Sequence, residues 1–229
     1  MIAERFKYAM LMASLPPHKP DLYAAKQTPI SEIQLQKRLQ WLEPQDAEDL
    51  AKIQSLLYWS KIPDASDENF IAHTSAILET LHNVFFRQVI TWRLELRTVI
   101  AALRKRHQGM KTPPDKSALG VGRWNLFIEK NWEQADFGIG RQLPWLDQAN
   151  TLIRNQDSLA LEKFLLNLVW RHYEQQGNGH YFDFEAVIIY VLRWDVINRW
   201  NHYHKQQAVQ RFSDIVEQRL QGVFDGFYQ

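Results

Sequence analysis

Eight histidines are the residues of this chain that most directly suggest metal or acid–base chemistry. Glu79 and His82 have the Glu-x-x-His spacing that di-iron helical bundles use twice, but the chain holds no second copy. His202 and His204 are two residues apart, so they would point to different sides of a helix, and no His-Glu-x-x-His occurs. Without cysteine, the chain has no thiolate ligand. These patterns predict no catalytic residue, no metal site and no bound cofactor.

Two short glycine echoes could bind anions through their backbone N–H groups. Gly120-Val121-Gly122-Arg123 and Gly138-Ile139-Gly140-Arg141 each place an apolar residue between two glycines and end on an arginine. Successive N–H groups in such a turn can form an anion-binding nest. Neither echo reaches a third glycine or follows an expected strand, so a dinucleotide-binding fold is not supported. We interpret both echoes as turns.

The bulk composition favours a globular protein that binds other proteins. Hydrophobic residues make up 45% and charged residues 23% of the 229 residues, which argues against disorder. Nine tryptophans suggest thick helix–helix seams or a binding surface, because a buried ring N–H usually needs a partner. A net charge of +1 gives no general attraction for nucleic acid or acidic membranes. The basic cluster Arg104–His107 is expected from the helix dipole alone, so we expect protein partners and no nucleic acid.

The apolar segments of the sequence are too short to cross a bilayer. The strongest run, Ala186–Leu192, covers seven residues, whereas a membrane-spanning helix needs roughly 20. The apolar stretch Tyr8–Leu15 runs into Pro16 without a cleavage site for an export signal. The absence of cysteine fits a reducing compartment. We therefore expect a cytoplasmic protein with no direct membrane span.

Helical spacing and capping residues account for most of the first half of the chain. Ser31 and Gln34 have capping-box spacing, and Glu43-Pro44 should end that helix and open the next. Ser66 should cap a third helix. Periodicity leaves Tyr8–Leu15 open as a short strand or a helical turn. A fourth helix has the cleanest apolar stripe, with six residues spaced 4, 3, 4, 3, 4: Phe85, Val89, Trp92, Leu96, Val99 and Leu103.

The second half repeats this helical style. Helices are expected near Trp124–Gln134, Trp145–Asn155 and Ser158–Gln176, and a long helical pattern begins near Asp183 and extends toward Leu220. Gly109 should follow the end of the fourth helix, and the stretch 109–122 is the only linker candidate. The predicted fold is all-α, a multi-helix bundle of two similar helical halves, 1–112 and 113–229, or one continuous domain.

One stripe on the long helix begins apolar and turns polar halfway along. Its residues follow the same 4, 3, 4, 3, 4 spacing: Phe184, Ile188, Val191, Asp195, Asn198 and His202. A carboxylate on an apolar seam needs a partner, because an unpaired buried charge is very costly. One interpretation is an internal salt bridge to Arg93, Arg97 or Arg193. The other is a polar socket at the mouth of a bundle, where another protein docks.

The two strongest helices share a local pattern one hundred positions apart. Arg93-Leu94-Glu95-Leu96-Arg97-Thr98 aligns with Arg193-Trp194-Asp195-Val196-Ile197-Asn198. Each segment has an arginine, an apolar residue, an acid and an apolar residue, followed by a small polar residue three positions after the acid. The repetition indicates that the halves are related.

This pattern resembles the acid-x-x-Asn signature in helices of the C-type subunit (called d in eukaryotes) of rotary V/A-type ATPases. That family is all-helical and is built from pseudo-symmetric repeats. Glu95 through Ile100, leading to Gly109, resembles its helix that runs into a glycine, and Asp195 through Arg199 resembles the later copy. Thr98 departs from the expected asparagine, and the chain is shorter than a typical member of that family, as if one of three repeats were missing. The opening Tyr8–Pro16 with Pro29-Ile30-Ser31 also resembles a short bacterial group associated with such ATPase operons.

The resemblance implies a protein without catalytic chemistry. It would lie on the cytoplasmic face of the membrane rotor ring, peripheral to the membrane, and receive the central stalk to transmit torque. The alternative is a free-standing helical adaptor or regulator with another partner, and a helical metalloenzyme is the least favoured interpretation. Under the resemblance, the residues that would join the repeats or line the docking surface are Arg93, Glu95, Arg97, Arg193, Asp195, Asn198, Arg199 and His202.

Overall fold

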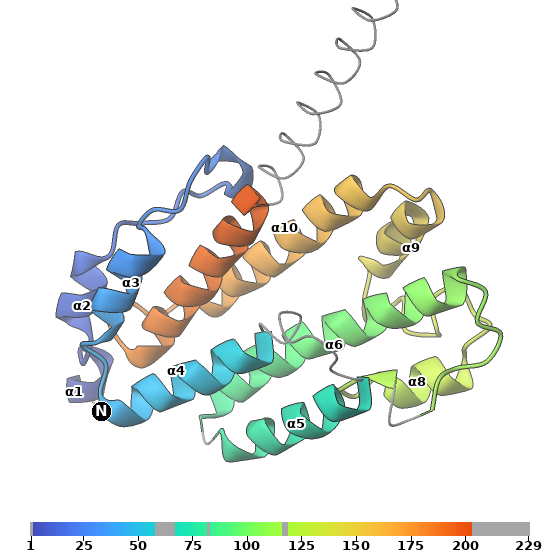
Figure 1. Ribbon diagram of the computed structural model, residues 1–229, viewed down its shortest axis with the longest axis horizontal. Coiled ribbons are helices and arrows are strands. Elements are labelled where there is room, and N and C mark those ends of the chain that lie inside the picture. The colour runs from blue at the N-terminus through green and yellow to red at the C-terminus, as the bar shows by residue number, and fades with distance from the viewer. Residues whose placement is uncertain (1, 58–66, 82, 116–118, 203–229) are drawn as a thin grey trace, which may run out of the picture.

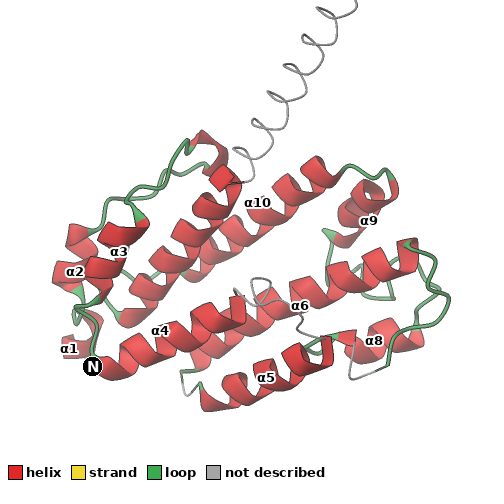
Figure 2. Cartoon of the chain, viewed as in Figure 1, coloured by secondary structure: helices red, strands yellow, loops and turns green. Residues whose placement is uncertain are grey.

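The computed structural model describes residues 2–57, 67–81, 83–115 and 119–202, and these residues form helices joined by loops (Figures 1 and 2). No strand occurs within these ranges, so the predicted all-α class is confirmed for them. No helix in the described part of the chain is both long and apolar enough to cross a membrane. Predictions at Ser66, His82, His204 and beyond residue 202 lie outside the described residues.

The N-terminal region is a series of short helices fixed by local caps. They are α1 (Ile2–Arg5), α2 (Ala9–Ser14), the 3-10 helix η1 (Leu22–Ala24), α3 (Glu32–Leu39) and α4 (Pro44–Leu57). The Ser31 hydroxyl accepts a hydrogen bond from the Gln34 N–H at 3.3 Å, as the capping-box spacing predicted. Pro44 opens α4, also as predicted. The ambiguous stretch at 8–15 contains α2 at residues 9–14, with Leu11 on its buried side.

The helix α5 (Asp67–Thr80) precedes α6 (Val84–His107), which carries the apolar stripe predicted from the sequence. Val89, Leu96, Val99 and Leu103 on this stripe are buried. The backbone of Gly109 has a φ of +94°, and the next N–H, of Met110, donates to the Lys105 carbonyl at 3.2 Å. This is the glycine-terminated helix end that the sequence predicted.

The remaining described helices are α8 (Asn125–Lys130), α9 (Leu146–Arg154), α10 (Ser158–Gln176) and a helix over residues 184–202. The predicted range of α10 is confirmed at both ends, whereas α8 ends four residues before the predicted Gln134. Tertiary contacts explain the shorter helix. The Arg106 guanidinium donates to the carbonyls of Trp132, Gln134 and Ala135. Because these carbonyls bind Arg106 of α6, the residues after 130 form turns and do not continue the helix.

Tryptophan N–H groups hold the N-terminal loops against the C-terminal helices. Trp194, on the helix at 184–202, donates to the Ile30 carbonyl at 2.7 Å, and Trp170, on α10, donates to the Pro20 carbonyl at 3.1 Å. In Figure 1 the orange-red helix at 184–202 therefore lies between α10 and the blue N-terminal elements. One hydrophobic cluster extends from Tyr8 to Trp200. The division into halves at residue 112 stays a prediction.

Candidate functional site

The first copy of the repeated motif holds the chain's own glycine loop against α6. The Thr98 hydroxyl donates to the Val121 carbonyl and accepts from the Val121 N–H, both at 3.0 Å. One oxygen of Glu95 accepts the Arg123 N–H at 3.1 Å and lies 3.5 Å from that residue's guanidinium Nε. Glu95 and Thr98 are both buried. We call Glu95, Thr98 and the loop 120–123 the α6 clamp.

The two glycines of the clamp are required by its geometry. Gly120 and Gly122 have φ values of +145° and +117°, which side chains rarely adopt. A Cβ on Gly120 would lie 2.2 Å from the Thr98 hydroxyl oxygen, and one on Gly122 would lie 2.3 Å from Cγ of Glu95. The predicted turn therefore uses its N–H groups to bind the chain's own side chains.

The second glycine segment, 138–141, also binds an acidic side chain of this chain through its backbone N–H groups. The N–H groups of Gly138 and Gly140 donate to the Asp136 carboxylate at 3.0 and 3.2 Å. A Cβ on Gly140 would lie 2.5 Å from a carboxylate oxygen of Asp136. Both echoes are turns, as predicted, and in both the backbone N–H groups bind an acid of this chain.

The second copy of the motif lies on the helix at 184–202, where the stripe changes from buried to exposed. Phe184, Ile188 and Val191 are buried, Asp195 and Asn198 are half-buried, and His202 is exposed. The His202 ring bonds back to the Asn198 carbonyl at 2.8 Å. We call Asp195, Asn198 and His202 the polar seam. Its half-buried start contrasts with the buried acid and threonine of the α6 clamp.

Arg93 and Asp195, one from each copy, both act electrostatically on Tyr173 of α10. The tyrosine is fully buried, and burial raises its pKa to about 12. The positive charge of Arg93 opposes that rise in pKa, whereas the negative charge of Asp195 adds to it. Both charged groups therefore lie close enough to influence the same phenol.

The first arginine of each copy acts electrostatically on a half-buried histidine. Burial lowers the pKa of His172 to about 4, and the charge of Arg93 contributes to that lowering. Burial likewise lowers the pKa of His18 to about 4, and Arg193 adds to the effect. The His172 ring stacks on Trp92 with centroids 3.6 Å apart, and the Arg193 guanidinium lies 4.0 Å from the Trp170 ring centroid. The shared feature is a tryptophan ring near each histidine, Trp92 at His172 and Trp170 at His18.

The other predicted arginines lie on separate parts of the surface. Arg193 lies 3.8 Å from Glu174, and Arg199 lies 2.9 Å from Glu162. The Arg97 side chain is exposed on α6. The predicted interaction residues therefore include the buried Glu95 of the clamp and the three residues of the polar seam, and Arg93 acts electrostatically on Tyr173.

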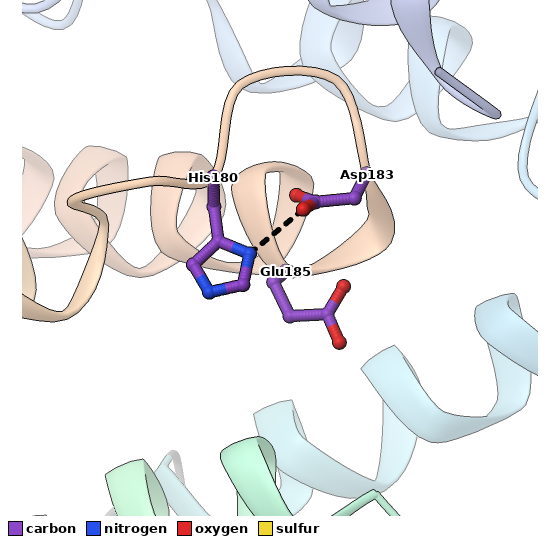
Figure 3. Close-up of side chains that lie close together, drawn as sticks. All are labelled: His180, Asp183 and Glu185. Atoms are coloured by element: carbon purple, nitrogen blue, oxygen red, sulfur yellow. Dashed lines mark hydrogen bonds and ion pairs between the residues drawn. The ribbon is translucent and has the colours of Figure 1, made fainter. Parts of the chain in front are cut away.

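One group of potential metal ligands was missed in the sequence. His180, Asp183 and Glu185 each offer a ligand atom, and these atoms lie within 4.8 Å of one another (Figure 3). The His180 Nδ1 atom lies 2.7 Å from an Asp183 oxygen, and Asn83 donates to Glu185 at 2.9 Å. The spacing of three and two residues crosses from a loop into a helix, so helical periodicity could not identify it. Asn83, at the start of α6, is brought to Glu185 only by the tertiary fold.

Comparison with known proteins identifies a family whose description assigns no function. A family model described as "Protein of unknown function (DUF2764)" matches residues 64–223, which is 160 of the 229 residues. This range includes both copies of the motif. No curated protein and no solved structure matches the chain.

Proposed function

Because the chain belongs to the DUF2764 family, whose description assigns no activity, we propose a function from the geometry of its two motif copies. We propose a non-catalytic protein of a rotary V/A-type ATPase, similar to the C-type (d) subunit, that couples the central stalk to the membrane rotor ring. The single observation that carries the proposal is the change along the helix at 184–202 from a buried apolar stripe to the polar seam.

The α6 clamp supports a binding role for this type of motif. An acid and a small polar residue one helical turn apart bind the backbone of a glycine-containing loop through both N–H and carbonyl groups. Such contacts recognise an exposed backbone and need no reactive group. The second copy presents the same residue types beside a more open surface, so it suits a loop or helix end supplied by another protein.

The surroundings of the polar seam also favour protein binding. The exposed Tyr23 ring lies at the same end of the helix, 5.0 Å from the ring of the buried Trp200, and Nζ of Lys163 lies 5.6 Å from the Trp200 ring centroid. Aromatic residues bordered by charge are typical of the energetically important centres of protein interfaces. The seam would thus combine polar recognition at Asp195 and Asn198 with the exposed ring of Tyr23.

Recovery of the tagged full-length chain from its native cell tests this proposal. We expect central-stalk and rotor-ring subunits of a rotary ATPase to co-purify with the wild-type protein. The double variant N198A/H202A should lose these subunits, while the control Gln148→Ala, on the exposed side of α9, should retain them.

Recovery without any component of the rotary ATPase, from a cell that contains this enzyme, would overturn the rotor assignment. A different protein captured through the seam would instead establish the helical adaptor. Identical capture by wild-type protein and N198A/H202A would remove the seam from the interface.

A further inference from the structure

Three side chains of metal-ligating type meet where the loop after α10 enters the helix at 184–202 (Figure 3). His180 comes from the loop, Asp183 precedes the first helical residue, and Glu185 lies in the first turn. All three are half-buried, and the relative exposure of the side chain is 29% for His180 and 17% for Asp183. They are held in a partly desolvated position, unlike carboxylates on an open surface.

Neighbouring groups orient each of these side chains. One Asp183 oxygen accepts the Ala186 N–H at 3.0 Å, and the other faces His180. Asn83 donates to Oε1 of Glu185 at 2.9 Å, which leaves Oε2 as a further acceptor. The Phe85 ring lies 4.9 Å from the imidazole, centroid to centroid. Outer partners of this kind fix ligand orientation in metal sites.

Capping explains only part of this arrangement. Asp183 is an ordinary helix cap, and its pair with His180 could serve that cap alone. Glu185 contributes nothing to the cap, yet Asn83, the N-cap residue of α6, donates to its carboxylate, and a ligand atom of Glu185 lies within 4.8 Å of those of His180 and Asp183. Two carboxylates and one imidazole therefore converge, which is a donor set with the charge to neutralise a divalent cation.

We propose that His180, Asp183 and Glu185 form a binding site for one divalent metal ion of the zinc type. The imidazole nitrogen favours zinc and its neighbours over magnesium and calcium, which prefer oxygen ligands alone. The metal would take the place of the proton between His180 and Asp183, and water would complete the usual four ligands. Because the sequence predicted no metal site, this inference departs from that expectation and is independent of the rotor assignment.

Such an ion would join three parts of the fold. His180 and Asp183 belong to the turn between α10 and the last described helix, and Glu185 is bonded to the start of α6. The neighbouring Phe182 carbonyl accepts the Tyr8 N–H at 2.8 Å, which connects the N-terminal region as well. Bound metal should therefore stabilise the folded chain by acting at this junction.

Zinc titration of the full-length chain, freed of metal with a chelator, tests the site. Calorimetry should show one zinc ion per chain, and the melting temperature should rise with zinc but not with the same concentration of magnesium. The variants Glu185→Gln and His180→Gln should each lower zinc affinity by about 10–100-fold or more. Glu185→Gln retains an acceptor for Asn83, so its fold should be preserved. Asn83→Ser retains a helix cap but loses the donor, and it should weaken zinc binding by about 10-fold.

Asp157→Asn is the matched control, because Asp157 caps α10 through the Ala160 N–H in the same way that Asp183 caps its helix. This control should bind zinc like the wild type. Absence of saturable zinc binding to the wild type would overturn the proposal. Wild-type affinity in both Glu185→Gln and His180→Gln would also overturn it, because the metal would then be bound by other residues.

Discussion

The α6 clamp and the polar seam contain the same residue pattern in two different environments. In the clamp, Glu95 and Thr98 are buried and bind the loop 120–123. In the seam, Asp195 and Asn198 are half-buried and lead to the exposed His202. Desolvated polar contacts cost several kcal/mol when broken, whereas exposed ones cost about 1 kcal/mol or less. From this comparison we propose that the first copy serves folding and the second serves binding.

The largest expected loss of stability follows a side chain placed inside the clamp. Gly122→Val combines a disfavoured φ of +117° with a Cβ 2.3 Å from Glu95, so we expect a loss of about 3–5 kcal/mol in the free energy of unfolding. Gly179→Val is the control for backbone strain alone, because its φ is +91° and nothing lies within 4 Å of a Cβ. Denaturant melts should separate the two variants, and equal losses would show that the clamp contact contributes little.

Truncation of the apolar part of the long-helix stripe should have the next largest effect. Val191 is buried, so Val191→Ala should lower the free energy of unfolding by about 1–3 kcal/mol. The same measurement on Met10→Ala, at an exposed position of α2, should show almost no change. If Val191→Ala unfolded like the wild type, Val191 would not belong to the core, and the polar seam would not begin after it.

The small polar residues of the two copies provide a direct comparison. Thr98→Ala leaves both polar groups of Val121 without their partner, so it should cost about 1–3 kcal/mol. Asn198→Ala, at the equivalent position of the seam, should cost about 0.5 kcal/mol or less. Chemical denaturation of the two variants measures this difference. Similar losses in the free energy of unfolding for the two variants would contradict the proposed difference between the clamp and the seam.

His172 and His18, the half-buried histidines influenced by Arg93 and Arg193, predict a loss of stability in acid. Their pKa is about 4 in the folded protein, whereas a free histidine side chain has a pKa of 6.5. The unfolded chain therefore binds more protons between these values, so stability present above pH 6.5 should fall as the pH is lowered toward 4. Unfolding measurements at a series of pH values should give a smaller decline for His172→Gln and His18→Gln. If the free energy of unfolding of these variants fell with pH as steeply as that of the wild type, the two histidines would not be the cause of the loss.

Local capping made much of the helical architecture predictable. Ser31, Pro44 and Gly109 begin or end helices where the sequence placed them, because each acts within about one helical turn. The end of α8 was predicted too late, since Arg106 binds carbonyls that lie almost thirty residues away. Nothing in the local pattern encodes such a contact.

The candidate sites were predictable only as residue types. The acid-x-x-polar pattern and the glycine echo were both visible in the sequence, but their pairing across 23 residues in the clamp depends on tertiary folding. The metal-ligand group was missed for a similar reason, because Asn83 and Glu185 are 102 positions apart. Residue type and spacing identified the residues of the clamp, whereas tertiary packing determined their partners and created the metal-ligand group.

The central claim is that the polar seam serves partner binding more than folding, and Asp195→Ala tests it most directly. We expect capture of the partner to be lost, while the free energy of unfolding falls by clearly less than the cost of breaking a buried ion pair, because Asp195 is only half-buried. The measurement is a denaturant melt combined with a partner pull-down from the native cell. A loss of about 3–5 kcal/mol would contradict the account, since it would identify Asp195 as part of an internal ion pair.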